Sequence, residues 1–86
     1  MKEVRFSEHA ELKIKVLSNH GIVVTKDLIL EVIRSPEGLE DGEDGKRIAQ
    51  RGLDKSRVLR VVYREFDAFI LIITLYPGRR SRYEKN

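Results

Sequence analysis

The sequence contains no cysteine, so the protein has no disulfide, no thiolate zinc site and no cysteine nucleophile. Long hydrophobic runs are missing as well. The longest run, Ala68 to Leu75, is far shorter than the roughly 20 residues that cross a bilayer. The N-terminal residues 1–5 lack the apolar stretch of a signal peptide. These absences predict a soluble, cytoplasmic protein that does not bind membranes.

The chain is also short, with 86 residues, and this predicts a single domain spanning residues 1–86. Hydrophobic residues make up 41% and charged residues 36%, a composition that is too apolar for a disordered chain. A domain of this size is near the lower limit of chains that bury a core unaided. We therefore expect a partner protein or a homodimer to contribute to its stability.

Charge is strongly segregated along the chain, although the net charge is only +3. Residues 37–45 carry five acidic side chains and no basic one. Residues 46–64 carry seven basic and one acidic, and residues 77–86 carry four basic and one acidic. Two basic blocks separated by an apolar segment are able to form one basic surface of the kind that binds nucleic acid.

Two helices are predicted in the first half of the chain. Ser7 is a good N-cap for a helix over about residues 8–19 or 8–20, and Gly21 is typical of the position just past a helix end. Thr25 is a similar cap for a second helix over about residues 26–34.

Strands are predicted in the second half, over residues 46–51, 57–65 and 69–76, and Pro77 is expected to end the last one. Leu59, Val61 and Tyr63 alternate with Val58, Arg60, Val62 and Arg64. Residues 4–6 are a candidate fourth strand at the sheet edge. The predicted fold class is α+β, with both N-terminal helices packed on one face of a small antiparallel sheet of three to four strands.

The acidic segment 37–45 contains three glycines and no β-branched residue, which predicts a solvated loop or the mobile start of a hairpin. It superficially resembles a calcium-binding loop. Placing the required glycine at Gly45, however, puts Gly42 and Arg51 where oxygen ligands are needed. The two histidines match no zinc-binding pattern. We expect no metal and no cofactor.

Histidine and lysine form a stripe on the first predicted helix, where His9, Lys13, Val16 and His20 share one side. Such a stripe is able to present two imidazoles and an ammonium to a substrate. The alternative is structural: His9 is then a first-turn surface residue, and His20 is favoured at the helix C-terminus by the helix dipole.

Arginine is more abundant than lysine, and most arginines lie on or after the predicted strands. They include Arg51, Arg57, Arg60, Arg64, Arg79, Arg80 and Arg82. Guanidinium groups suit bidentate phosphate contacts. We expect four of them, Arg51, Arg64, Arg79 and Arg82, to surround one concavity, with Tyr83 able to stack on a base or transfer a proton. The alternative is a solvated basic face with Tyr83 packed on the sheet edge.

Several short motifs together resemble those of a known family. They are Phe6-Ser-Glu-His-Ala, Asn19-His-Gly-Ile22, Gly45-Lys-Arg, Arg57-Val-Leu-Arg-Val-Val-Tyr-Arg-Glu65, Ile70 to Thr74, and Arg82-Tyr83. This order resembles the BrnT toxins and a related small family of unknown function, which are in turn similar to the RelE/ParE superfamily of toxin–antitoxin systems. The likeness extends over nearly the whole chain.

The resemblance implies a RelE-like fold and a metal-free RNA endonuclease, in which the RNA 2′-hydroxyl attacks the adjacent phosphate. The matching catalytic positions are His20, Arg64, Arg82 and Tyr83. The RNA-binding candidates are Arg51, Arg57, Arg60, Arg79 and Arg80. The implied partners are RNA, free or on the ribosome, and a small antitoxin protein.

One departure from the BrnT pattern concerns catalysis, because Tyr76 stands where that pattern has an arginine after the last strand. If that arginine is essential, the protein binds RNA without cutting it. Two alternatives therefore stay open: a non-catalytic module that binds nucleic acid or an acidic protein segment, and a ParE-like topoisomerase inhibitor. Both have the same fold and a basic surface.

Overall fold

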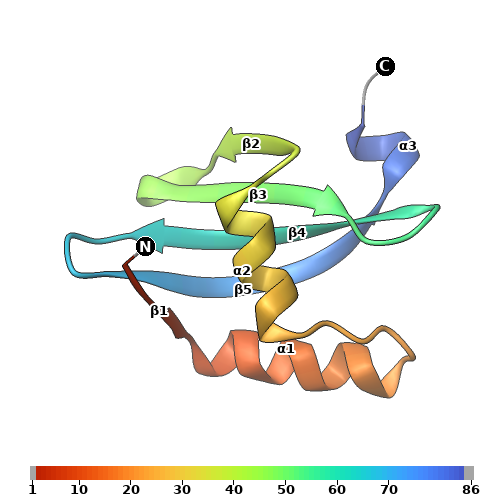
Figure 1. The fold of residues 1–86 in the computed structure, drawn as a ribbon, viewed down its shortest axis with the longest axis horizontal. Coiled ribbons are helices and arrows are strands. Elements are labelled where there is room, and N and C mark those ends of the chain that lie inside the picture. Colours follow the sequence, from red (N-terminus) through yellow and green to blue (C-terminus); the bar gives the residue numbers. More distant parts are fainter. Residues whose placement is uncertain (1, 85–86) are drawn as a thin grey trace.

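Five strands form one mixed sheet in the order β1-β5-β4-β3-β2, and two helices cover one of its faces (Figure 1). The structure is a computed structural model that describes residues 2–84. Its elements are β1 (Glu3–Phe6), α1 (Glu8–Asn19), α2 (Lys26–Arg34), β2 (Gly38–Asp41), a 3-10 turn (Glu43–Gly45), β3 (Lys46–Gly52), β4 (Arg57–Glu65), β5 (Phe69–Arg79) and α3 (Arg80–Tyr83).

Side-chain caps begin the two long helices, whose predicted ranges are confirmed. The Ser7 hydroxyl accepts a hydrogen bond from the Ala10 amide at 3.0 Å, and the Thr25 hydroxyl accepts one from the Leu28 amide at 3.0 Å. Ser7 also donates to the Ile73 carbonyl at 2.7 Å, which fixes the start of α1 against β5. Within residues 2–84, no helix has the length and apolar character needed to cross a membrane.

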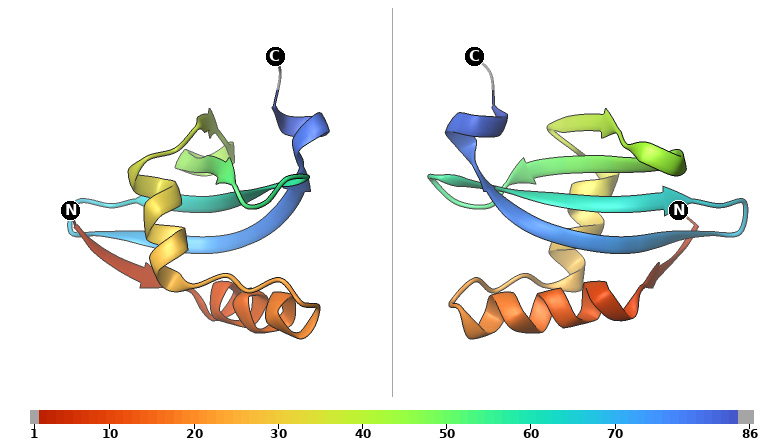
Figure 2. Two further views of the ribbon diagram at one scale, coloured as in Figure 1. Left: turned by 45° about the vertical axis from the view of Figure 1, so that its right-hand side comes forward. Right: turned by 180° about the vertical axis from the view of Figure 1, so that it is seen from behind.

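The hydrophobic core lies between the helices and one face of the sheet. Its buried members are Ala10, Leu17, Val24, Ile29, Val32, Ala49, Leu59, Val61, Tyr63, Ile70, Ile72 and Leu75. Side chains alternate across a strand, so Leu59 and Val61 face the helices whereas Arg60 projects from the opposite face. We call this second face the open face, because among residues 2–84 only the short helix α3 covers part of it (Figure 2).

The predicted sheet of three to four antiparallel strands is wrong: the sheet has five strands and is mixed. β1 does lie at the edge, as expected, but it runs parallel to β5, pairing Glu3 with Phe69 and Phe6 with Ile72. β2 forms within the acidic segment, which was expected to be a solvated loop or the mobile start of a hairpin, and it pairs antiparallel with β3 as the first strand of a hairpin. Its sequence has little strand propensity, so this pairing, rather than local preference, holds it in place.

The C-terminal end also differs from the prediction, because Pro77 does not end β5. The strand continues to Arg79, and α3, which was not predicted, follows directly. β1 pairs with β5 only as far as Ile72, so Pro77 lies where one edge of β5 is free. Proline is tolerated there because its missing N–H removes no ladder hydrogen bond.

Candidate functional site

Arg60 is the centre of the candidate site, because it is a charged side chain buried on the open face. It lies in the middle of β4 and is only 4% exposed. Its Nε donates a hydrogen bond to the Tyr76 hydroxyl at 3.0 Å. Its Nη1 donates to a Glu40 carboxylate oxygen at 3.0 Å and to the Gln50 side-chain carbonyl. Four strands thus meet at one guanidinium, since β2, β3, β4 and β5 each contribute one of these residues.

The Arg60 guanidinium is charged and has unused hydrogen-bonding capacity. Burial by itself lowers the pKa of Arg60, but the hydrogen bonds to Glu40 and Tyr76 outweigh it, and the pKa is raised above its ordinary value. Its Nη2 has no hydrogen-bond partner among residues 2–84, yet no fully buried side-chain nitrogen or oxygen of that range is unpaired. Nη2 is therefore not completely buried, and its two N–H groups have no partner within the described residues.

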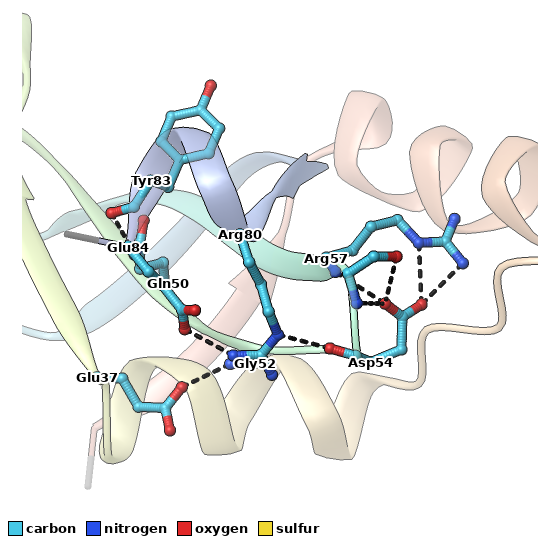
Figure 3. Close-up of polar contacts among 9 residues, drawn as sticks. Glu37, Gln50, Gly52, Asp54, Arg57, Arg80, Tyr83 and Glu84 are labelled. Carbon is cyan, nitrogen blue, oxygen red and sulfur yellow. Dashed lines mark hydrogen bonds and ion pairs between the residues drawn. The ribbon is translucent and has the colours of Figure 1, made fainter. Parts of the chain in front are cut away.

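Tyr83 covers this guanidinium from α3. The Arg60 Cζ lies 4.0 Å from the centroid of the Tyr83 ring, which is a close cation–π contact. The Tyr83 carbonyl accepts a hydrogen bond from the Gln50 amide at 3.4 Å. The Tyr83 hydroxyl points away from these contacts (Figure 3) and has no protein partner within the described chain. The phenol is therefore available to a ligand that binds beside Arg60.

Two glycines make room for α3 on the open face. Gly52 and Gly78 lie on either side of Val58 in one row across β3, β4 and β5. A Cβ at Gly52 would collide with the Arg80 guanidinium, and a Cβ at Gly78 would collide with the Tyr83 ring. The lack of a side chain at these two glycines thus lets α3 lie close to the sheet. Val58, between them, is fully buried beneath α3.

Arg80 fixes α3 to the turn between β3 and β4 (Figure 3). Its Nε donates to the Asp54 carbonyl at 2.7 Å, and its Nη1 pairs with Glu84 at 2.7 Å. The Arg80 amide also donates to the Ser56 carbonyl at 2.9 Å. Arg80, expected to bind RNA, therefore already has protein partners that position Tyr83.

Two other predicted residues lie on or beside the open face. Arg64 is exposed on β4 four residues after Arg60, about 13 Å along the strand, and its Cζ lies 5.0 Å from the Phe66 ring centroid. Arg82 is exposed on α3 next to Tyr83. Arg60 and Arg64 thus lie on one face of β4, and the Arg82 Cζ lies 5.7 Å from the ring centroid of Tyr83, which stacks on Arg60.

Other predicted arginines lie on the helix-covered face, so the expectation that Arg51 and Arg79 surround one concavity together with Arg64 and Arg82 is wrong. Arg51 pairs opposite Leu59 on the helix-covered face, where its Nη1 donates to the Ser35 carbonyl at 2.7 Å. Arg57 is opposite Arg79 on that same face and pairs with Asp54 at 2.8 Å. The register of β3 with β4 decides the placement of Arg51, and the register of β4 with β5 decides that of Arg79.

His20 also lies in the helical layer, at the C-terminal end of α1. Its Nδ1 is 2.9 Å from the Val16 carbonyl, and its side chain is exposed. His9 is exposed in the first turn of the same helix. The sheet separates both imidazoles from Tyr83 on the open face, so the four predicted catalytic residues do not meet at one point.

Three residues of the site were missed in the sequence: Glu40, Gln50 and Tyr76. One observation was available to find them. In the sequence, Arg60 interrupts the apolar run from Val58 to Val62 at the centre of a predicted strand, and a guanidinium buried there needs acceptors from the neighbouring strands. Glu40 was hidden because its segment was not read as a strand. Within residues 2–84, no group of three or more His, Asp or Glu side chains is placed to hold a metal ion.

Comparison of the sequence with known proteins gives no match to a family model, and no curated protein is significantly similar. The structure does resemble solved structures. YafQ from E. coli strain BL21(DE3) matches with a TM-score of 0.57 at 11% identity, covering 99% of this chain and 100% of that chain. YafQ in the E. coli DinJ-YafQ toxin-antitoxin complex matches with a TM-score of 0.58 at 12% identity, over 98% of both chains.

A third similar structure is the conserved hypothetical protein HP0894 from Helicobacter pylori, with a TM-score of 0.50 at 17% identity. It covers 94% of this chain and 97% of that chain. The protein therefore shares its fold with YafQ. At these identities the likeness concerns the fold alone, and none of the matches supports the narrower BrnT-like assignment.

Proposed function

We propose that this protein is the toxin-like component of a toxin–antitoxin pair and that its open face binds and cleaves RNA. The observation that carries the proposal is the buried, charged Arg60 on a sheet face that the two long helices leave uncovered. A guanidinium held by three side chains is preorganised, so it stabilises negative charge without the cost of ordering itself during the reaction. RNA presents such charge at every phosphate.

In the proposed reaction, an RNA 2′-hydroxyl attacks the adjacent phosphate, the bond to the 5′-oxygen breaks, and a 2′,3′-cyclic phosphate and a 5′-hydroxyl form. Arg60 binds the phosphate through Nη1 and Nη2 and stabilises the charge that develops on it. The free Tyr83 hydroxyl donates its proton to the departing 5′-oxygen, and the proton of the 2′-hydroxyl passes to solvent water. Arg82 adds positive charge beside this phosphate, and Arg64 binds a neighbouring one along β4.

RNA binding without cleavage is the second candidate function, and two specific observations favour it. His20 is separated from Tyr83 by the sheet, so the site lacks an imidazole among residues 2–84. Tyr76 occupies the position of the BrnT-pattern arginine, and it accepts a hydrogen bond from Arg60 instead of supplying a second guanidinium. Both candidates use the same surface and differ in chemistry only.

A small antitoxin is the proposed protein partner. Support comes from the DinJ-YafQ complex, because a fold neighbour of this chain was crystallised there with such a partner. Basic charge on the open face makes an acidic segment of an antitoxin a suitable inhibitor, since it would compete with RNA for the same guanidinium groups.

Induced expression followed by analysis of cellular RNA tests the proposal. Cleavage predicts growth arrest and RNA fragments that end in cyclic phosphate, and purified protein should produce the same ends in the presence of a chelator. Arg60→Lys should abolish these effects, because a lysine cannot make the forked contacts of arginine. The matched control is Arg34→Ala, which removes an exposed arginine at the end of α2. Intact RNA with tight binding would indicate the second function instead.

A further inference from the structure

The Glu40 carboxylate is the anionic group that contacts the Arg60 guanidinium. Its carboxylate accepts from Arg60 Nη1 at 3.0 Å through one oxygen only. A carboxylate and a phosphate oxygen are equivalent partners for a guanidinium, and both prefer a two-bond geometry. Glu40 leaves Nη2 unused, so it forms a weaker contact than a phosphate that spans both terminal nitrogens.

The two partners of this ion pair differ greatly in exposure, since Glu40 is 56% exposed and Arg60 is 4% exposed. The arginine is therefore a fixed part of the sheet, whereas the carboxylate can rotate into water at little cost. Glu40 lies on β2, an edge strand that pairs only with β3, so few contacts restrain it. An incoming anion is thus able to displace it.

We propose that Glu40 is an internal substitute for phosphate, which holds Arg60 in place and lowers RNA affinity until RNA displaces it. This inference rests on the proposed RNA-binding function and adds a residue that sets affinity and selectivity. When a ligand displaces Glu40, the carboxylate exchanges its single contact with Arg60 for contacts with water. A ligand gains binding energy from this exchange only if it engages both Nη1 and Nη2. Phosphodiesters fulfil this condition.

The variant that tests the inference is Glu40→Gln, which keeps a hydrogen-bond acceptor for Arg60 and removes the charge. The matched control is Asp41→Asn, an equal change of charge at the next residue of β2. Asp41 is 89% exposed and lies opposite Arg47 on the other face. If RNA were attracted by net charge alone, the two variants would show the same gain in RNA affinity, because each substitution raises the net charge by one.

The main measurement is the affinity of each variant for a single-stranded RNA oligonucleotide, by fluorescence anisotropy. Glu40→Gln should tighten binding by about tenfold or more, since displacing a charged hydrogen bond costs on the order of 1.5 kcal/mol, whereas Asp41→Asn should change it by about twofold at most. Equal effects of the two variants, or no tightening in Glu40→Gln, would overturn the inference while leaving RNA binding intact.

A second measurement separates this inference from the proposed function. Pyrophosphate is titrated into both variants, and the Arg60 Nε–H resonance is followed by NMR. A shift that saturates at lower concentration in Glu40→Gln than in Asp41→Asn supports the displacement of Glu40, even if no variant binds RNA. Identical titrations of the two variants would reject the displacement, whatever the RNA result. Thermal unfolding of each variant verifies that the sheet is intact.

Discussion

The Tyr83 ring lies over the Arg60 guanidinium, with 4.0 Å between Cζ and the ring centroid, and thereby joins the C-terminal helix to the centre of the sheet. The ring packs on Gly78 and leaves its hydroxyl free. Tyr83 thus has two separable properties: a face that holds Arg60 and a hydroxyl that is free for proton transfer.

Two substitutions of Tyr83 should separate these properties. Tyr83→Phe keeps the ring, so we expect RNA affinity to stay within about twofold while the cleavage rate falls by about 100-fold or more, the scale of a lost acid or base. Tyr83→Ala should lower both affinity and rate. Single-turnover cleavage and anisotropy measure the two effects. Full cleavage activity in Tyr83→Phe would show that the hydroxyl takes no part in the chemistry.

The close packing of α3 against Gly78 predicts that Gly78→Ala strongly affects the position of α3. The added methyl group collides with the Tyr83 ring, so α3 should leave the sheet and expose Val58. We expect faster hydrogen exchange in α3, reduced RNA binding and a loss of about 1 kcal/mol in the free energy of unfolding, at the low end for overpacking because α3 can move away.

Gly42→Ala is the matched control for this change, because a Cβ at Gly42 makes only ordinary contacts, 3.5 Å from Lys46. It should leave hydrogen exchange in α3 unaltered. If α3 remained as protected from exchange in Gly78→Ala as in the control, the Tyr83 ring would be able to adjust while α3 stays on the sheet. The glycine at position 78 would then not be needed for the packing of α3.

How far the sequence predicts this fold depends on whether the information is local. Both long helices were predicted because Ser7 and Thr25 are caps that act within one turn. The faces of β4 were predicted as well, because alternation separates Leu59 from Arg60 on a single strand. The strand β2 was not predicted, since Leu39 is its one apolar residue and the position of β2 depends on its pairing with β3.

The candidate site was predictable only in part for the same reason. The alternation in β4 places Arg60 and Arg64 on one face without any knowledge of other strands. Arg51 was misplaced because its face depends on the register between β3 and β4, which pairs it with Leu59. A shift of one residue would have moved it to the open face. Hydrophobic pattern alone does not fix that register for so polar a strand.

The salt dependence of RNA binding should reveal the role of Arg64. If Arg64 contacts a phosphate, Arg64→Ala should reduce the slope of log affinity against log salt by about 0.7, as expected for the loss of one contact to single-stranded nucleic acid. Arg34→Ala removes an exposed arginine from the helical layer and should leave the slope unaltered. Equal slopes in the two variants would exclude Arg64 from the RNA-binding surface.

The last prediction concerns the turn between β3 and β4, on which α3 rests. The hydrogen bond from Arg57, followed by the backbone amide of Ser56, lowers the pKa of Asp54 below its ordinary value of 3.8. A carboxyl group with a lowered pKa in the folded state stabilises the fold above its unfolded pKa, and this contribution is lost as the pH falls through the folded pKa.

Wild type should therefore be more stable than Asp54→Asn at neutral pH, and the difference should shrink as the pH is lowered from about 5 to 2. Urea unfolding at a series of pH values measures it. The comparison variant is Asp67→Asn, in the exposed turn between β4 and β5, for which no hydrogen bond to the side chain is found among residues 2–84. Its stability should follow that of wild type across this range. A difference between wild type and Asp54→Asn that stays constant with pH would mean that Asp54 acts through neutral hydrogen bonds rather than through its charge.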